Sequence, residues 1–266
     1  MTRNAPPFPM SFHSRIHVHD DLREFDVIGD VHGCYEELVE LLERLGHRRL
    51  LDPDVARAAD HERPQVIFVG DIVDRGDGII EALQLVHRLW KRGHALTVLG
   101  NHDDRFHRWL AGGDVHIRHG LEASIEQFDR LPPDARHQWR TELLDFFSRL
   151  PWAMRIDRGR ALVAHAAWHA DLHLEASPER IRRYALFGPT TGQRTAEGYP
   201  ERIDWAPHYT GPDLVIFGHQ VYPEPYRNDY AVGIDTGCVF GGALTAYRYP
   251  SGEIVSVASR RARVAK

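Results

Sequence analysis

Short apolar segments of this chain are repeatedly followed by a side chain that can bind a metal ion. The segments FDVI, VIFV, LTVL, ALVA and LVIF each read as a buried strand, and four of them run directly into glycine. The polar residues at these five segment ends are Asp30, His32, Asp71, Asn101, His165 and His219. Because parallel strands end at a common edge of a sheet, where α/β proteins place their sites, we expect these six side chains to converge.

The donor atoms of these side chains indicate a class of metal. They offer oxygen and nitrogen and no thiolate, a set that disfavours a structural zinc site and suits Mn²⁺, Fe or catalytic Zn²⁺. Six donors are too many for one ion with an open position, whereas two ions about 3.5–4 Å apart could share one carboxylate. Asp71 lies between the two halves of the set in the sequence and is the expected bridge. The prediction is a pair of divalent ions, with Mn²⁺ preferred and Ni²⁺, Fe and Zn²⁺ as alternatives.

Strands and helices alternate over the first hundred residues, in an order that would position these side chains. Strand patterns at residues 25–28, 66–69 and 95–99 are separated by helical patterns at residues 35–45 and 79–92. This βαβαβ order predicts a parallel sheet with right-handed crossovers. Glycine at the strand exits lets the backbone turn tightly and lets a ligand approach closely.

The remainder of the chain divides into a helical part and a strand-rich part. Residues 103–150 are mostly helical in pattern and predict an insertion that covers one side. After Pro151 strand patterns dominate, which predicts two sheets packed face to face with helices outside. Residues 178–209 are rich in turn residues, and a stretch of that length is more often a binding loop than a linker. We expect one domain, residues 25–266, after a loosely docked N-terminal arm, residues 1–24.

Composition narrows the class of protein. The chain has 266 residues, a net charge of −5 and 42 % hydrophobic residues. No apolar run reaches the roughly 20 residues of a membrane-spanning helix, and the N-terminal residues lack the pattern of a secretory signal. We therefore expect a cytoplasmic protein without a membrane partner. No Lys/Arg-rich run marks a nucleic-acid footprint, so strong binding to duplex DNA is not expected.

Histidine is abundant, with 18 residues, yet most of these need no chemical role. Histidines on the predicted helices and loops, such as His87 and His94, are expected to be solvated. The two cysteines, Cys34 and Cys238, lie too far apart in the sequence to suggest a metal knuckle or a disulfide framework. They suit a reducing compartment.

The motifs GDVHG, GDIVDRG and GNHD, followed by AHA and GH, stand in the order typical of the calcineurin-like metallophosphoesterases. The chain resembles this PPP-type family over residues 25–257, which implies an α/β fold of the αββα sandwich type. GNHD and the segment IDTGCVFGGALTAYRYP resemble the bacterial branch that holds diadenosine tetraphosphate hydrolases and polynucleotide kinase-phosphatases. From residue 185 onward the chain is most similar to the phosphatase domain of the latter, although the kinase motif GxxxxGK[ST] is absent.

Three residues beside the expected ligands could assist hydrolysis of a phosphoester. The expected nucleophile is a hydroxide that bridges the two ions. His102, next to Asn101, is the expected general acid, and Asp74 would orient its imidazole. Arg75 would clamp phosphoryl oxygens through its fork of N–H groups.

Several functions share this predicted centre. The first is a phosphatase for nucleotide or nucleic-acid-end phosphates, acting on phosphomonoesters and 2′,3′-cyclic phosphodiesters. The alternatives are a diadenosine tetraphosphate hydrolase and a serine/threonine protein phosphatase. A non-enzymatic metal-binding interaction module is the alternative from another class, and the presence of Asp74, Arg75 and His102 together argues against it. The substrate, the native metal and the oligomeric state stay open at this point.

Overall fold

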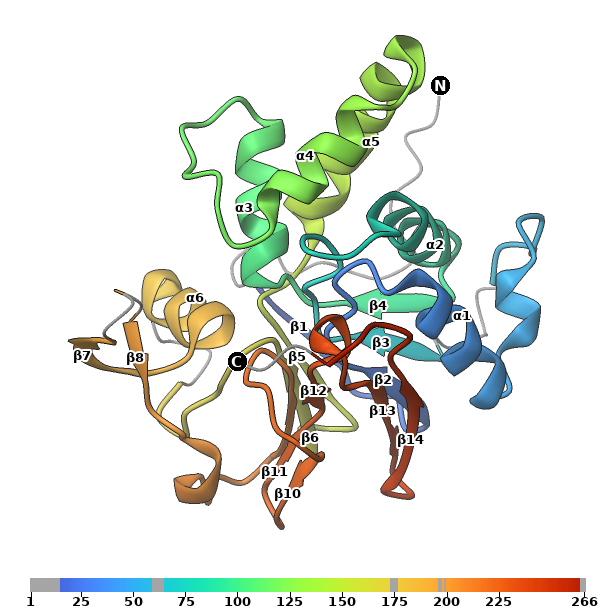
Figure 1. Cartoon of the computed structure of the whole chain (residues 1–266). Helices are drawn as coiled ribbons and strands as arrows, with labels where there is room; N and C mark the ends of the chain where they lie inside the picture. Colours follow the sequence, from blue (N-terminus) through green and yellow to red (C-terminus); the bar gives the residue numbers. More distant parts are fainter. Residues whose placement is uncertain (1–14, 59–64, 173–176, 196–197, 199, 264–266) are drawn as a thin grey trace.

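Two six-stranded sheets form the centre of the computed structural model, which describes residues 15–58, 65–172, 177–195, 198 and 200–263 (Figure 1). The first sheet has the order β1 (Ile16–His19), β5 (Ala153–Ile156), β6 (Ala161–Ala164), β9 (Leu214–Phe217), β11 (Ala231–Gly233), β10 (Tyr226–Arg227). The second has the order β12 (Asp235–Thr236), β13 (Ala243–Tyr249), β2 (Phe25–Ile28), β3 (Val66–Phe68), β4 (Ala95–Thr97), with β14 (Glu253–Ala258) beside β13. A separate hairpin pairs β7 (Thr190–Arg194) with β8 (Pro200–Arg202).

The two sheets pack face to face through alternate strand residues. Val27 and Ile67 of the second sheet share one hydrophobic cluster with Val163 and Ile216 of the first, and all four are fully buried. Side chains alternate between the faces of a strand, so the intervening residues face the helices. The mixed α/β sandwich predicted from the sequence is therefore confirmed.

Helices cover the outer faces of the sandwich (Figure 1). The α-helices are α1 (Tyr35–Arg44), α2 (Ile79–Arg92), α3 (Asn101–Leu110), α4 (Leu121–Asp129), α5 (Pro133–Arg149) and α6 (Pro178–Phe187). Short 3₁₀ helices are η1 (Arg48–Leu51), η2 (Ala206–His208) and η3 (Cys238–Phe240). The helix α2 follows the predicted residues because its Leu83 and Val86 are buried, and because Gly93 adopts a left-handed φ of 82° that ends it.

Most predicted elements are present, and two segments differ. Residues 16–19 were expected in a loose arm, but they form β1, which pairs in parallel with β5 at the edge of its sheet. The segment IHVH has only two apolar residues, and one of them, Val18, is 51 % exposed in the structure. The helix α6 begins inside the stretch predicted to be turns. Ser177 caps it by accepting the Arg180 N–H, and Pro178 occupies the first turn, where proline is tolerated.

The expectation of solvated histidines is wrong at two positions. His87 and His94 are 6 % and 4 % exposed. His94 Nε2 lies 2.7 Å from the backbone oxygen of Ala56, and His87 packs against Trp139 and Phe146.

None of the helices in the described part of the chain has the length and the apolar character of a membrane-spanning segment.

Candidate metal centre and active site

The exits of five strands bring the predicted ligands together. β2, β3 and β4 are parallel neighbours in one sheet, and β6 and β9 are parallel neighbours in the other, so their carboxyl ends meet at one edge of the sandwich. The close approach of neighbouring atoms leaves no room for a side chain at two of the glycines in these turns. A Cβ on Gly218 would lie 1.9 Å from Oδ1 of Asp30, and one on Gly100 would lie 2.2 Å from the backbone nitrogen of Asp71.

Asp71 stands at the centre of the ligand set. Its Oδ2 lies 3.5 Å from Nε2 of His32 and 3.4 Å from Nε2 of His165. Two groups of side chains could each hold an ion, namely His32, Asp71 and His102, and Asp71, His165 and His219. Asp71 belongs to both groups, which is the position that the sequence analysis expected for the bridging carboxylate. The structure adds His102 to one of the groups, since its Nε2 lies 4.0 Å from Asp71 Oδ2.

The other expected ligands adjoin the second group. Asn101 Oδ1 lies 3.0 Å from Nε2 of His165, and that nitrogen lies 3.0 Å from Nδ1 of His219. Both carboxylate oxygens of Asp30 accept the backbone N–H of His219 at 3.1 Å. The structure thus brings all six predicted metal-binding residues to one place.

Backbone carbonyl groups fix the orientation of two imidazoles. Nδ1 of His32 lies 2.7 Å from the carbonyl oxygen of Val73, and Nδ1 of His165 lies 2.9 Å from that of Val69. A carbonyl oxygen can only accept, so Nδ1 carries the proton in both rings. Each Nε2 therefore carries a lone pair close to Asp71, the atom through which a neutral imidazole binds a metal ion, and at His32 this lone pair accepts an Arg75 N–H in the structure.

Burial sets the protonation of the site. It raises the pKa of Asp71 to about 7 and raises that of Asp30 well above its ordinary value. Burial also lowers the pKa of His165 to about 4, which keeps this imidazole neutral and able to donate its lone pair. Among the described residues, Nε2 of His219 is buried without a hydrogen-bond partner. A pair of divalent cations would compensate the buried carboxylates and satisfy this nitrogen, so the residues fit such a centre.

The three predicted catalytic residues lie on one side of Asp71. His102 Nδ1 is 2.5 Å from Oδ2 of Asp74, whose Oδ1 accepts the Ser124 hydroxyl at 2.6 Å. The guanidinium of Arg75 donates to Nε2 of His32 at 2.5 Å and to Nε2 of His102 at 2.9 Å. His102, Asp74 and Arg75 are therefore in mutual reach, as the sequence analysis expected.

The backbone of the site is unusually strained. His32, Asp71, Asp74, Arg75 and His219 all have left-handed φ values, between 43° and 73°. Such conformations are uncommon for residues other than glycine and cluster at functional sites. The surrounding hydrogen bonds must hold them, and Asp103 supplies several of these.

Asp103 is a site residue that the sequence analysis did not select. Its carboxylate is fully buried and accepts the backbone N–H groups of Asp71 at 2.8 Å and of Ile72 at 3.0 Å. It lies in the GNHD motif, so its position next to His102 was a usable signal.

Arg202 of β8 is a second residue near the site that the sequence did not indicate. Its Nη1 donates to the backbone oxygen of His219 at 3.2 Å.

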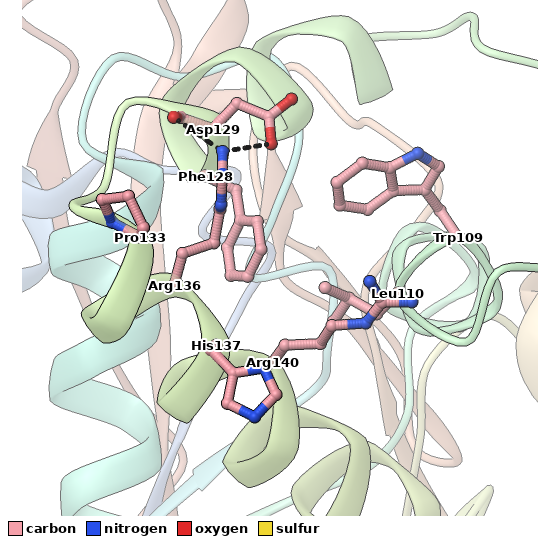
Figure 2. A pocket seen from close by; sticks show the side chains of 8 residues that line it. All are labelled: Trp109, Leu110, Phe128, Asp129, Pro133, Arg136, His137 and Arg140. Atoms are coloured by element: carbon pink, nitrogen blue, oxygen red, sulfur yellow. Dashed lines mark hydrogen bonds and ion pairs between the residues drawn. The ribbon is translucent and has the colours of Figure 1, made fainter.

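A separate cavity of about 430 Å³ lies between α3, α4 and α5 (Figure 2). Trp109 and Phe128 line it together with Arg136, which donates to the backbone oxygen of Asp129 at 3.1 Å. The ten residues of α3 rise about 13 Å from Asn101 to the cavity end of the helix. Within the described part of the chain, no predicted site residue lines this cavity, so the metal centre is a different place.

Comparison with known proteins agrees with this geometry. The family model described as calcineurin-like phosphoesterase matches residues 24–223. A relative from Geobacillus sp. (strain WCH70), named bis(5′-nucleosyl)-tetraphosphatase PrpE [asymmetrical], is 36 % identical over 89 % of this chain and 94 % of its own length. The protein of the same name from Bacillus subtilis (strain 168) is 35 % identical over 88 % of this chain and 94 % of its own length.

Solved structures share the fold. A crystal structure named for a diadenosine tetraphosphatase covers 94 % of this chain and all of its own, with a TM-score of 0.65 and 26 % identity. A serine/threonine phosphatase from Saccharomyces cerevisiae covers 98 % of this chain and 85 % of its own, with a TM-score of 0.53 and 13 % identity. The chain belongs to the calcineurin-like metallophosphoesterases and is a metal-dependent hydrolase of phosphoric esters.

Proposed function

We propose that this enzyme hydrolyses bis(5′-nucleosyl) tetraphosphates asymmetrically, releasing a nucleoside triphosphate and a nucleoside monophosphate. The observation that carries the proposal is the similarity to relatives of that name over 89 % of this chain and 94 % of theirs. This reaction was an alternative in the sequence analysis, behind nucleic-acid ends, and the relatives now favour it.

In this proposal six side chains hold two divalent cations, with Mn²⁺ as the expected metal. They are Asp30, His32, Asp71, Asn101, His165 and His219. When bound, the cations supply charge neutralisation of phosphoryl oxygens and a water nucleophile that is acidic enough to react near neutral pH. Asp103 keeps Asp71 in its left-handed turn by accepting its backbone N–H.

Two arginines provide positive charge at different ends of the ligand set. Arg75 lies against His32 and His102, while Arg202 reaches the backbone of His219. A guanidinium binds phosphate oxygens through paired N–H donors. A chain of four phosphates carries several anionic groups, so it could engage both arginines when it lies across the centre. A single phosphomonoester is too short to contact both arginines at once, so it gains less binding energy from them.

The leaving phosphate requires a proton or a hydrogen bond as its bond to phosphorus breaks. We assign this role to Nε2 of His102. Burial and the Arg75 guanidinium lower the pKa of His102, and Nε2 accepts an Arg75 N–H, so this nitrogen can carry a proton only after phosphate oxygens have engaged Arg75. The carboxylate of Asp74, which contacts Nδ1 of the same ring, would then stabilise the imidazolium. Ser124 holds Asp74 in turn, so the proton donor keeps its orientation during turnover.

One substrate panel tests the proposed function. Metal-free enzyme is supplied with Mn²⁺ and offered diadenosine tetraphosphate, 2′,3′-cyclic nucleotides, a 3′-phosphorylated oligonucleotide and a phosphopeptide. We expect the tetraphosphate to give the highest kcat/KM, with ATP and AMP released in equal amounts. Release of ADP alone would contradict asymmetrical cleavage, and a preference for the cyclic nucleotide or the oligonucleotide would favour the nucleic-acid-end function instead. Asp71→Asn, expected to be inactive on all four, controls for contaminating hydrolases.

Two finer expectations accompany this proposal. A cytoplasmic location stays a prediction, supported by the two cysteines, which are free thiols in the structure. The organisation as one domain also stays a prediction, and β1 (Ile16–His19) belongs to its first sheet although the expected boundary was residue 25.

A further inference from the structure

A second group of metal-binding side chains lies outside the centre described above. It consists of Cys34, Glu37 and Cys238, whose donor atoms all lie within 4.8 Å of one another. The three side chains are 5 %, 5 % and 2 % exposed, so the group is buried. About two hundred residues separate the two cysteines in the sequence. The fold joins them.

Local structure explains how the group forms. Cys34 is the N-cap residue of α1, and Glu37 lies three residues later in the first turn, so both point to the same face of the helix. Cys238 comes from the other end of the chain, at the start of η3. The side chain of Cys34 makes no capping hydrogen bond to α1, which leaves its sulfur directed to the group.

The Glu37 carboxylate is the feature that the fold alone does not explain. Buried carboxylates are normally paired with a cation or bound to a metal. Within the described ranges, Glu37 has no ion pair, and its Oε1 accepts the backbone N–H of Arg260 at 2.8 Å. The Arg260 guanidinium is engaged elsewhere, by Glu36 at 2.7 Å and Glu40 at 3.2 Å. A cation between Glu37 and the sulfurs would compensate this buried charge.

The donor set selects a different metal from that of the catalytic centre. Two sulfurs and one carboxylate suit Zn²⁺ and related thiophilic ions, whereas Mn²⁺ prefers oxygen and imidazole. We propose that Cys34, Glu37 and Cys238 form a structural site for a thiophilic divalent cation of the Zn²⁺ type, separate from the two-metal centre.

Binding at this site changes the protonation of the cysteines and ties two elements together. Each thiol loses its proton to solvent as its sulfur binds the cation, so two protons are released and no electron is transferred. The bound cation joins the start of α1 to η3. These elements flank the catalytic centre. The helix α1 follows the turn that contains His32, and the Arg75 guanidinium carbon lies 5.3 Å from the ring centre of Phe240 in η3. The bound cation therefore stabilises the two elements, α1 and η3, that lie next to His32 and Arg75.

Cadmium provides a direct test, because thiolate bound to Cd²⁺ gives a charge-transfer absorption in the ultraviolet. The chain has two cysteines, so the absorption can arise only from Cys34 and Cys238. We expect metal-free, reduced protein titrated with Cd²⁺ to develop this absorption to saturation at one equivalent per chain. Protein purified without chelator should contain zinc that Cys34→Ser and Cys238→Ser lose.

Glu37 is tested against its neighbour on the same helix. Glu37→Gln should weaken Cd²⁺ binding by about tenfold or more, the effect that loss of even an outer partner has on metal sites. Glu36→Gln, at an exposed residue paired with Arg260, should bind like the wild type. No charge-transfer absorption in the wild-type protein at excess Cd²⁺ would overturn the proposal, as would a reducible disulfide between the two cysteines in the purified protein. The wild-type titration decides even if a variant fails to fold, and it is independent of phosphatase activity.

Discussion

The carboxylate of Asp74 lies 2.5 Å from Nδ1 of His102, in a contact buried from solvent. Asp74 belongs to the turn after β3, and His102 is the second residue of α3, after β4. Ser124 of α4 secures the pair by donating to Asp74 at 2.6 Å. Two strand exits and a helix of the insertion thus combine to orient one imidazole toward Asp71.

This geometry makes His102 the expected proton donor, and His102→Ala tests it. We expect kcat on an alkyl phosphate to fall by about 10²–10⁴-fold, the usual contribution of general acid catalysis. On an activated aryl phosphate the loss should be much smaller, because that leaving group needs no proton. An unchanged rate on the alkyl phosphate would exclude the role.

Metal content must be measured for the same variant, because His102 also lies in one of the two metal-binding groups. If His102 acts as the proton donor, His102→Ala keeps the full metal content of the wild type. A variant that loses one ion per chain would identify His102 as a ligand instead.

Asp103 is expected to set the affinity of the centre for metal. Asp103→Asn replaces one of the two oxygens that accept the backbone N–H groups of Asp71 and Ile72 with an NH2 group, which cannot accept, so the left-handed turn at Asp71 loosens. We expect Mn²⁺ affinity to fall by about 10–100-fold, as for other residues that orient metal ligands. Saturating Mn²⁺ should restore most of kcat.

Asp104→Asn is the matched control, since Asp104 is the next residue and pairs with Arg108 and Arg182. It should change stability and leave Mn²⁺ affinity near the wild-type value. Equal losses of affinity in the two variants would show that the effect of Asp103 is not specific.

Arg202 is expected to bind the phosphate chain of the substrate. Arg202→Ala should raise KM for diadenosine tetraphosphate by about 10–100-fold, which corresponds to one charge-assisted hydrogen bond. Arg194→Ala alters the partner strand of the same hairpin, where the Arg194 side chain donates to the backbone of Gly198. Steady-state kinetics should show no comparable change for that variant, and an equal rise in KM would assign the effect to the hairpin as a whole.

His87 predicts how stability depends on pH. Burial among aromatic rings lowers its pKa from 6.5 to about 4 in the folded protein, with Glu142 Oε2 3.9 Å away. Between pH 6.5 and about pH 4, His87 is protonated in the unfolded chain and neutral in the folded protein. The free energy of unfolding therefore falls as pH falls through this range. From about pH 7 to about pH 5 this residue should cost about 2 kcal/mol.

Urea unfolding in the presence of a chelator measures this effect without a contribution from bound metal. His87→Leu should lose about that much of the pH dependence, because leucine takes up no proton. His116→Ala, at an exposed histidine, should keep the wild-type slope. A His87→Leu protein with an unchanged slope would contradict the prediction.

The strand exits could be predicted from the sequence because each carries a local signal. An apolar run, a glycine and a polar side chain stand next to one another at Asp30, Asp71 and His219, and parallel pairing then brings them to one edge. The segment IHVH at β1 has no such signal, because only its pairing with β5 gives it regular structure.

Other residues gained their places only through packing. Ser124 lies 50 residues from Asp74 and reaches it because α4 folds back along α3. Cys34 and Cys238 meet because η3 folds against the start of α1. Such contacts depend on the arrangement of whole elements, which spacing along a single sequence does not reveal.

The shared position of Asp71 between two ligand groups is the central claim, and electron paramagnetic resonance of the Mn²⁺ enzyme tests it most directly. Two Mn²⁺ ions joined by one carboxylate and a few ångströms apart are magnetically coupled. We predict that metal-free protein loaded with two equivalents of Mn²⁺ gives a coupled spectrum, and that Asp71→Asn does not. Uncoupled Mn²⁺ at every loading of the wild-type protein would contradict the account.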